Sequence, residues 1–210
     1  NIDKFIFSLI LTLFFLGLFF SLVSTSLIAS DKLDTNSYYF FIKHFVFIIL
    51  GIIILIVFSF IKEELLFKLS IILFIISFIS LILVPLIGIE VKGSRRWIDL
   101  GFLPRFQPVE IIKPFLIIIL SALLCIKKNN LYIKYFLSSI LLLPILFLLI
   151  SQPDLGQTLL IAMLWLTLIF VSGINIYLFF LFFLTISLTA TYLIFFVSKF
   201  SYIKMRLLSF

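Results

Sequence analysis

The sequence predicts an all-α protein, a polytopic transmembrane helical bundle with about seven spans in a single membrane domain over residues 1–210. Its residues are 64% hydrophobic and only 12% charged, whereas a soluble globular domain has about 25% charged residues. The 29 phenylalanines cannot all be packed inside a soluble core of 24.4 kDa, but lipid solvates them. Long uncharged runs also recur along the chain between short polar connections, as expected of successive membrane spans.

Each span is bounded by the charged residues that flank an apolar run. A bilayer core about 30 Å thick needs roughly 20 apolar residues in a helix. A polar connection over residues 31–43 separates the first two spans, and its Tyr38 and Tyr39 suit the membrane interface. The expected spans lie near residues 5–30, 44–61, 65–89, 108–126, 135–151, 155–172 and 176–198.

The fourth span takes charged residues into its first turns. Too few uncharged residues lie between Pro114 and Lys127 to cross a bilayer, so the helix begins near Pro108, which suits a first helical position. Glu110 then lies where the helix dipole favours an anion, and Lys113 follows on the same face. We expect Pro114 to bend this helix.

The last apolar run is too long for one helix. From Leu155 to Ser198 no residue is charged, and at 1.5 Å per residue this run measures about 66 Å, about twice the hydrocarbon thickness. It is therefore predicted to form two helices that meet at residues 172–175, where a serine, a glycine and an asparagine make a turn.

Charge and cysteine content narrow the class of function. The formal net charge is +7, but the basic residues flank the spans, where they meet lipid headgroups or anionic lipid-linked ligands rather than nucleic acid. Cys125 is the one cysteine, so no intrachain disulfide can form. His44, the one histidine, has no metal-ligating partners at ligand spacing. No metal site and no cofactor are predicted, and a need for a divalent cation stays open.

Polar residues concentrate in one connection, residues 91–114, and in a shorter stretch, residues 152–157. Polar groups at membrane depth are costly and are usually functional. These two stretches are therefore predicted to form the functional site. Their polar landmarks are Arg95, Arg96, Trp97, Asp99, Arg105, Gln107, Glu110, Lys113, Gln152 and Asp154.

Three ordered motifs resemble the SEDS family of bacterial cell-wall proteins, the group that includes FtsW and RodA. They read Lys-Gly-Ser-Arg-Arg-Trp-Ile at residues 92–98, Gln-Pro-Val-Glu-Ile-Ile-Lys at 107–113 and Gln-Pro-Asp-Leu-Gly-Gln at 152–157. Their order and spacing match over nearly the whole chain, which makes the resemblance specific. Val109 stands where the family's pattern has serine, and Gly156-Gln157 is more similar to the division branch than to the elongation branch.

The resemblance implies a ten-span peptidoglycan glycosyltransferase of the bacterial cytoplasmic (inner) membrane. Such a protein polymerises lipid II, a polyprenyl-pyrophosphate-linked disaccharide peptide, into glycan strands during cell division. Its implied partners are a class B penicillin-binding protein transpeptidase and other divisome membrane proteins. Because the sequence begins at Asn1 and stops at Phe210 after a basic cluster, we expect an N-terminal fragment that is inactive alone. The family's principal catalytic carboxylate would follow Phe210.

The distribution of basic residues and the family resemblance predict opposite orientations of the chain in the membrane. Alternating spans place six Lys and Arg residues on the side of the N-terminus and ten on the side of residues 91–114. The positive-inside rule therefore puts that connection in the cytoplasm. The resemblance instead implies a cytoplasmic N-terminus and an outer connection, and we follow it, since basic residues can be retained for an anionic ligand.

Strand extension needs a base for a sugar hydroxyl and cations for the departing pyrophosphate. Arg95 and Arg96 can supply the cations, because guanidinium binds phosphate oxygens in a fork; headgroup anchoring is the alternative interpretation. Trp97 either stacks on a sugar or belongs to the interfacial aromatic belt. Lys43 is matched to the basic residue that begins the family's second span.

Glu110 and Lys113 form either a structural ion pair or a direct ligand contact. Asp154 is interpreted as a catalytic site carboxylate that also caps the sixth span by accepting from the Gly156 or Gln157 amide. The predicted substrate-binding set comprises Arg95, Arg96, Trp97, Gln107, Glu110, Lys113, Gln152 and Lys43.

Two other functions stay open. One is a transporter or flippase of lipid-linked cell-wall precursor, which would use the same basic pocket without any bond chemistry. The other is a non-catalytic membrane scaffold of the division or elongation machinery, which would position a partner enzyme. Polymerisation of purified lipid II separates the glycosyltransferase from both.

Overall fold

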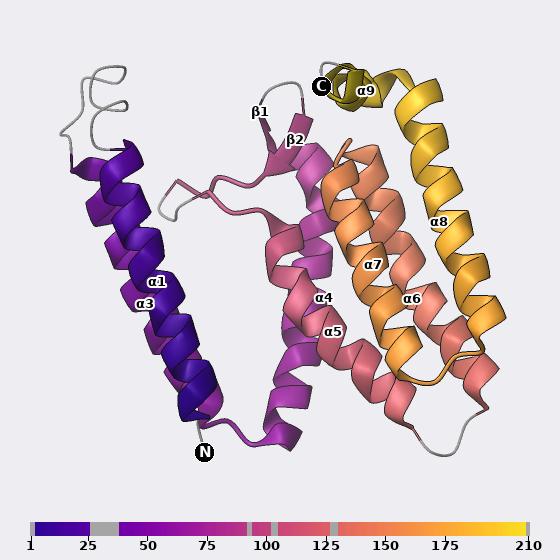
Figure 1. Ribbon diagram of the computed structural model, residues 1–210, viewed down its shortest axis with the longest axis horizontal. Helices are drawn as coiled ribbons and strands as arrows, with labels where there is room; N and C mark the ends of the chain where they lie inside the picture. Colours follow the sequence, from indigo (N-terminus) through magenta and orange to yellow (C-terminus); the bar gives the residue numbers. More distant parts are fainter. Residues whose placement is uncertain (1–2, 26–37, 92–93, 102–104, 127–129, 209–210) are drawn as a thin grey trace. The chain divides into compact units, whose positions relative to one another are not determined.

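The computed structural model describes residues 3–25, 38–91, 94–101, 105–126 and 130–208 (Figure 1). The chain divides into two compact units, Asn1–Leu66 and Phe67–Phe210. Each unit is helical, which confirms the all-α polytopic bundle. The single membrane domain over residues 1–210 stays a prediction.

In the described residues of the first unit, α1 (Lys4–Thr25) packs on α3 (Tyr39–Ser59). Gly17 of α1 faces His44 of α3, since a Cβ there would lie at an ordinary contact distance, 3.6 Å, from Cε1 of His44. The predicted boundary between connection and second span is wrong, since α3 begins at Tyr39 rather than at His44. The four residues before Lys43 are Tyr, Phe, Phe and Ile, which continue the apolar run. The predicted end of the first span, residues 26–30, and the connection from residue 31 to residue 37 lie outside the described residues.

The described residues of the second unit form a bundle of five long helices with a hairpin and a short helix at one end. Figure 1 shows α7 between α5 and α8, and α7 also packs on α6. The core is made of fully buried aliphatic side chains, among them Leu81, Ile112, Leu120, Ile145 and Ile161. The long helices are α4 (Glu63–Ile87, whose first residues belong to the first unit), α5 (Pro108–Cys125), α6 (Leu131–Ser151), α7 (Leu155–Val171) and α8 (Ile176–Phe196).

Six of the described helices are long and apolar enough to cross a membrane, namely α1, α3, α4, α5, α6 and α8. The chain is therefore a multi-pass membrane protein. The remaining predicted span, α7, is an apolar helix of 17 residues, about 25 Å long at 1.5 Å per residue. It is shorter because Asp154 caps its start and Gly173, with φ of 87°, follows its end.

Helix starts agree with the prediction at Pro108, but not where a span was taken to begin just after a lysine. The start of the fourth span at Pro108 is confirmed, and Pro114 lies inside the helix. The fifth span begins four residues earlier than predicted, at Leu131. Lys134, which the prediction placed outside the span, instead lies inside the helix. Its side chain is buried, and its Nζ donates 2.9 Å to the carbonyl oxygen of Leu124.

A β-hairpin was not predicted. The strands β1 (Ile89–Val91) and β2 (Ser94–Trp97) pair antiparallel, so the third predicted span ends at Ile87 rather than Ile89. Gly88 joins the hairpin to α4. A Cβ there would collide with the carbonyl oxygen of Val84 and lie 3.3 Å from that of Trp97, so the hairpin lies directly against the end of α4.

The chain after α8 forms a 3-10 turn, η1 (Ser198–Phe200), and a short helix, α9 (Ser201–Leu208). Phe200 is buried, and α9 contacts the end of α8. In Figure 1 the hairpin, the start of α7 and α9 lie at the same end of the second unit. The motifs of residues 91–114 and 152–157 are therefore brought to one end of the bundle.

Candidate functional site

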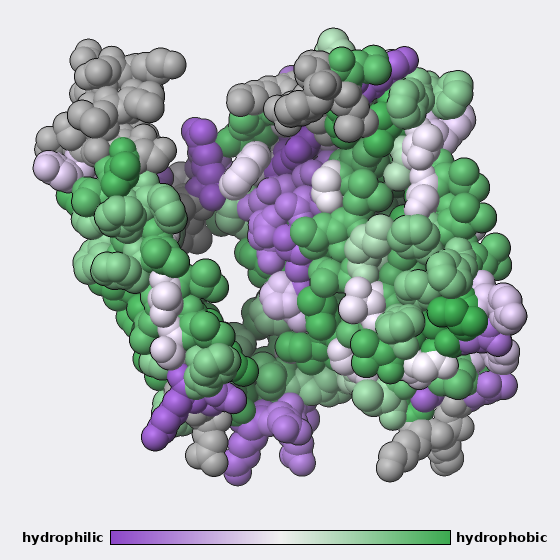
Figure 2. Space-filling model, viewed as in Figure 1, coloured by the Kyte–Doolittle hydropathy of each residue, from purple (hydrophilic) through white to green (hydrophobic). Residues whose placement is uncertain are grey.

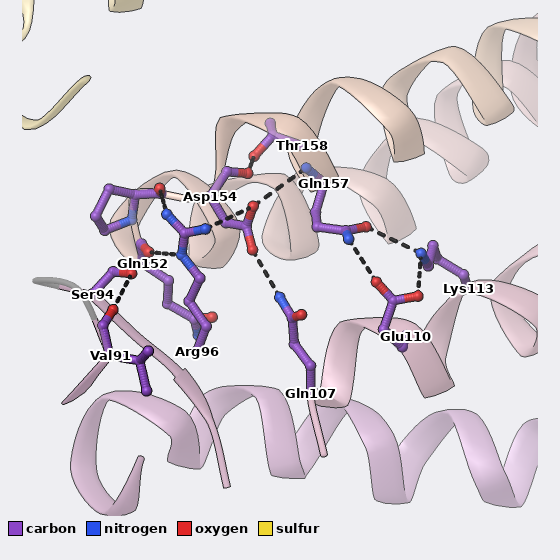
Figure 3. Close-up of polar contacts among 11 residues, drawn as sticks. Val91, Ser94, Arg96, Gln107, Glu110, Lys113, Gln152, Asp154, Gln157 and Thr158 are labelled. Atoms are coloured by element: carbon purple, nitrogen blue, oxygen red, sulfur yellow. Dashed lines mark hydrogen bonds and ion pairs between the residues drawn. The ribbon is translucent and has the colours of Figure 1, made fainter. Parts of the chain in front are cut away.

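The polar motifs meet where β2 and the N-terminal turns of α5 and α7 come together. Figure 2 shows hydrophilic residues gathered over this part of the second unit, with hydrophobic surface around them. Figure 3 shows the side chains, which form two clusters of opposite charges linked by residue 157. We call the first the Arg96 cluster (Arg96, Gln107, Asp154) and the second the Lys113 cluster (Glu110, Lys113, Gln157).

Arg96 holds the turn that precedes α7. Its Nε donates 3.3 Å to the carbonyl oxygen of Gln152 and its Nη2 donates to that of Pro153. Its Nη1 lies 3.5 Å from Oδ1 of Asp154. All three guanidinium nitrogens thus contact one three-residue turn, in the fork geometry that only arginine offers.

Asp154 is a buried carboxylate, 5% exposed. Its Oδ2 accepts from Nε2 of Gln107 at 2.8 Å, and its Oδ1 accepts from the backbone amide of Gln157 at 3.4 Å. The predicted N-cap of this helix is therefore confirmed. Arg96 is a third partner, so both carboxylate oxygens of Asp154 are engaged.

The Lys113 cluster is a closed ring of three side chains across α5 and α7 (Figure 3). Nζ of Lys113 lies 2.6 Å from Oε2 of Glu110. Gln157 bonds both: its Nε2 donates to Oε1 of Glu110 at 2.6 Å, and its Oε1 accepts from Lys113 at 3.1 Å. The side chain of Lys113 is 16% exposed and that of Glu110 is 50% exposed, so the ring borders the surface. The predicted contact between Glu110 and Lys113 is confirmed.

The remaining predicted residues of this end lie around the clusters. Gln152 is buried and donates 3.1 Å to the carbonyl oxygen of Leu81, which ties the turn to α4. Arg95 is exposed; it lies 3.8 Å from Glu90 across the hairpin and donates 3.4 Å to the carbonyl oxygen of Pro85. Trp97 is 37% exposed at the end of β2.

Lys43 belongs to the unit that does not contain these motifs. It is an exposed residue of α3, in the first unit. Its substrate-binding role stays a prediction.

Asp99 and Arg105 form a further ion pair in the connection between the hairpin and α5. Their side chains meet at 2.9 Å, and Oδ1 of Asp99 accepts from the amide of Gly101 at 2.9 Å. The Gly101 amide and then Arg105 hold the pKa of Asp99 below its ordinary value. Gly101 has φ of 76°, a left-handed conformation suited to glycine.

Four described basic side chains of the hairpin, the connection after it and α5 are already paired with acids. Arg95, Arg96, Arg105 and Lys113 each contact a carboxylate. An anionic ligand that binds these four groups must therefore use the N–H groups that the pairs leave, or displace a carboxylate. Among the described residues, no three His, Cys, Asp or Glu side chains gather in a group that could hold a metal ion.

Sequence reasoning placed Gln157 in a motif but not in the site. Its contact with Glu110 and Lys113 joins residues 47 and 44 positions apart. One signal was available: Gln157 lies three residues after the N-cap, at the first turn of α7 and close to its cap. The reach of its side chain to α5 depends on the packing of the two helices.

Fold and site together define a multi-pass membrane protein with two neutralised charge clusters at one end of its bundle. Residues 3–210 match the model of the FtsW, RodA and SpoVE family, described as cell cycle proteins. The chain belongs to this family.

Curated relatives of this chain are named as probable peptidoglycan glycosyltransferases. A probable peptidoglycan glycosyltransferase FtsW of Coxiella burnetii is 36% identical over 172 residues, covering 80% of this chain and 46% of that protein. The corresponding protein of Buchnera aphidicola is 36% identical over 184 residues, covering 85% and 45%. The chain thus spans about half the length of the curated relatives it matches.

Solved structures share the fold. The crystal structure of the rod shape determining protein RodA of Thermus thermophilus matches with a TM-score of 0.64 and 28% identity, over 82% of this chain and 58% of that one. A second match, described as a peptidoglycan synthase complex that coordinates polymerization and crosslinking, has a TM-score of 0.65 and 28% identity. It covers 92% of this chain and 59% of that one.

Proposed function

We propose that the protein to which this chain belongs is a peptidoglycan glycosyltransferase that polymerises lipid II during cell division. The observation that carries the proposal is the pair of charge clusters, Arg96–Asp154 and Glu110–Lys113, built from three motifs at one end of a family bundle. The names of the curated FtsW relatives support the reaction and the division branch.

The chemistry of strand extension fits this end of the bundle. The reaction joins a sugar hydroxyl of one lipid-linked disaccharide to the anomeric carbon of another and displaces a polyprenyl pyrophosphate. The departing pyrophosphate needs preorganised N–H donors, which Lys113 and the exposed arginines Arg95 and Arg105 supply in this proposal. Trp97 would stack on a sugar ring beside them.

Asp154 and Glu110 differ in how available their carboxylate oxygens are for acid–base catalysis. Asp154 has its oxygens occupied by Arg96, Gln107 and the Gln157 amide, so in this proposal it shapes the site rather than taking a proton. This replaces the catalytic role proposed for Asp154 from sequence. Glu110 is half exposed and each of its oxygens has one partner, so it retains lone pairs for a ligand.

The bacterial inner membrane and a transpeptidase partner belong to the same proposal. A related structure is described as a complex that couples polymerization to crosslinking, and a class B penicillin-binding protein would supply the crosslinking activity. The substrate carries its disaccharide outside the cytoplasm, so we place the hairpin end of the bundle there. Other divisome membrane proteins are proposed as further partners.

Purified full-length protein with its transpeptidase partner provides the test. We expect it to convert lipid II into glycan strands that a muramidase digests, and we expect the variant Lys113→Met to lose most of this activity. Transport of fluorescent lipid II across vesicles without strand formation would identify a flippase instead. Neither strands nor transport, with retained binding of the transpeptidase, would identify a scaffold.

A further inference from the structure

The amide of Gln157 bonds two partners of opposite charge. A carboxamide is neutral and carries a donor and an acceptor on one carbon. Its Nε2 donates to Oε1 of Glu110 at 2.6 Å, and its Oε1 accepts from Nζ of Lys113 at 3.1 Å. Because a carboxylate only accepts and an ammonium only donates, one orientation of the amide satisfies both (Figure 3).

The ring engages two of the three N–H donors of the Lys113 ammonium. An ammonium has three N–H donors, and Glu110 and Gln157 take two of them. Within the described residues no third partner of Nζ is recorded, and the side chain is 16% exposed. The third N–H is therefore available to an acceptor that reaches the site from outside the chain.

Gln157 provides the hydrogen bond that connects the Lys113 ammonium to α7. Glu110 and Lys113 are three residues apart on α5, so their pair alone fixes Lys113 only with respect to its own helix. Gln157 connects the pair to α7, and its backbone amide donates to Asp154 of the Arg96 cluster. One residue thus contacts all three charged groups of the two facing helix ends.

We propose that Gln157 is a positioning residue that holds the Lys113 ammonium where its remaining N–H contacts an anionic phosphate oxygen of a lipid-linked substrate. This inference rests on the proposed function and adds to it the group that places the cation. Gln157 itself does not touch the substrate in this proposal. It acts through Lys113.

The variant Gln157→Glu separates positioning from packing, because it keeps the size and shape of the side chain. When ionised, the new carboxylate faces Glu110, loses the donor of the amide and draws Lys113 away from its place. When protonated, it has an O–H donor and a C=O acceptor and reproduces the ring. The charged groups around it are Glu110 and Lys113 of α5, Asp154 of its own helix and, through Asp154, Arg96 of β2.

The experiment measures lipid II polymerisation and lipid II binding by full-length wild type, Gln157→Glu and Gln157→Leu between about pH 5.5 and pH 7.5, a range that spans the titration of a perturbed glutamate. Thr167→Ala is the matched control on α7, since Thr167 is exposed and its hydroxyl donates only to Met163 of its own helix. We expect Gln157→Leu to lose activity on the order of 10- to 100-fold at every pH. Gln157→Glu should show this loss at the upper pH and regain activity relative to wild type as the pH falls.

The other outcomes contradict the role of Gln157, the proposed function, or both. A Gln157→Glu profile parallel to that of wild type, or wild-type activity of Gln157→Leu, contradicts the role of Gln157. Wild type that binds lipid II without polymerising it contradicts the proposed function, and the pH comparison of binding then decides the role of Gln157. Wild type that neither binds nor polymerises lipid II contradicts both.

Discussion

Glu110 and Lys113 form an ion pair, and removing one member of a partly buried pair costs more than removing both. Lys113 is largely covered while Glu110 is half exposed. Removing Glu110 therefore leaves a mostly buried ammonium with the neutral Gln157 as its partner, whereas removing both charges leaves none.

We expect Glu110→Ala to destabilise the protein more than the double change of Glu110 and Lys113 to alanine does. The difference should be about 1–3 kcal/mol, below the range for fully buried pairs because Glu110 is partly solvated. Thermal unfolding of the purified variants in one detergent measures it. Equal stability of the single and double variants would show that the pair has no such role.

Asp99 provides a pH-dependent contact in the connection before α5. Its pKa is lowered by the Gly101 amide and by Arg105. A lowered folded-state pKa means that the contact stabilises the connection above the unfolded-state pKa and is lost as the pH falls through the folded-state pKa. We expect a carboxyl NMR titration of Asp99 to have its midpoint below the ordinary value, and Arg105→Gln to raise that midpoint. A midpoint unchanged by Arg105→Gln would contradict the ion pair.

Sequence predicts the contacts of this site that are local and misses those that are not. The cap of Asp154 and the pair of Glu110 and Lys113 join residues three apart, so helical spacing is enough to predict them. Arg96 contacts carbonyl groups 56 and 57 positions away. That contact depends on how the hairpin packs against the start of α7, which no local pattern encodes.

At the scale of elements, long uncharged runs predict the helices, and their ends move by a few residues. Tyr39 and Leu131 begin their helices earlier than predicted because a lysine inside each run does not interrupt a helix. The hairpin is missed because strands of three and four residues are too short to show a period of two.

The junction of α4 and the hairpin leaves no space for a side chain at residue 88. We expect Gly88→Ala to destabilise the protein by about 1–3 kcal/mol, as overpacked positions do, because the added Cβ would meet the carbonyl oxygens of Val84 and Trp97. Thermal unfolding provides the measurement. Gly156→Ala is the control, since a Cβ at Gly156 meets nothing within 4 Å. Equal stability of both variants would contradict the close contact.

At the scale of the molecule, the helices of the second unit alternate in direction. The hairpin and the start of α7 lie at one end, and the turn after α7 lies at the other (Figure 1). If the hairpin end is outside the cytoplasm, the larger group of basic residues also lies there, against the positive-inside rule.

Thiol labelling in intact spheroplasts tests this orientation. The background variant is Cys125→Ala, which removes the exposed native cysteine. A cysteine at the exposed Leu100, between hairpin and α5, should react with an impermeant reagent. A cysteine at Asn130, before α6, should react only after permeabilisation. The reverse pattern would place the hairpin end in the cytoplasm.

Photo-crosslinking to lipid II tests most directly whether the hairpin end binds the substrate. In the full-length protein, a photoreactive phenylalanine replaces Trp97 or Ile111, which are 37% and 40% exposed beside the two clusters. Phe196, 76% exposed at the end of α8, is the control at the same end of the bundle. We expect crosslinks to lipid II from positions 97 and 111 and only background from position 196. Equal crosslinking from all three positions, or crosslinking from position 196 alone, would contradict it.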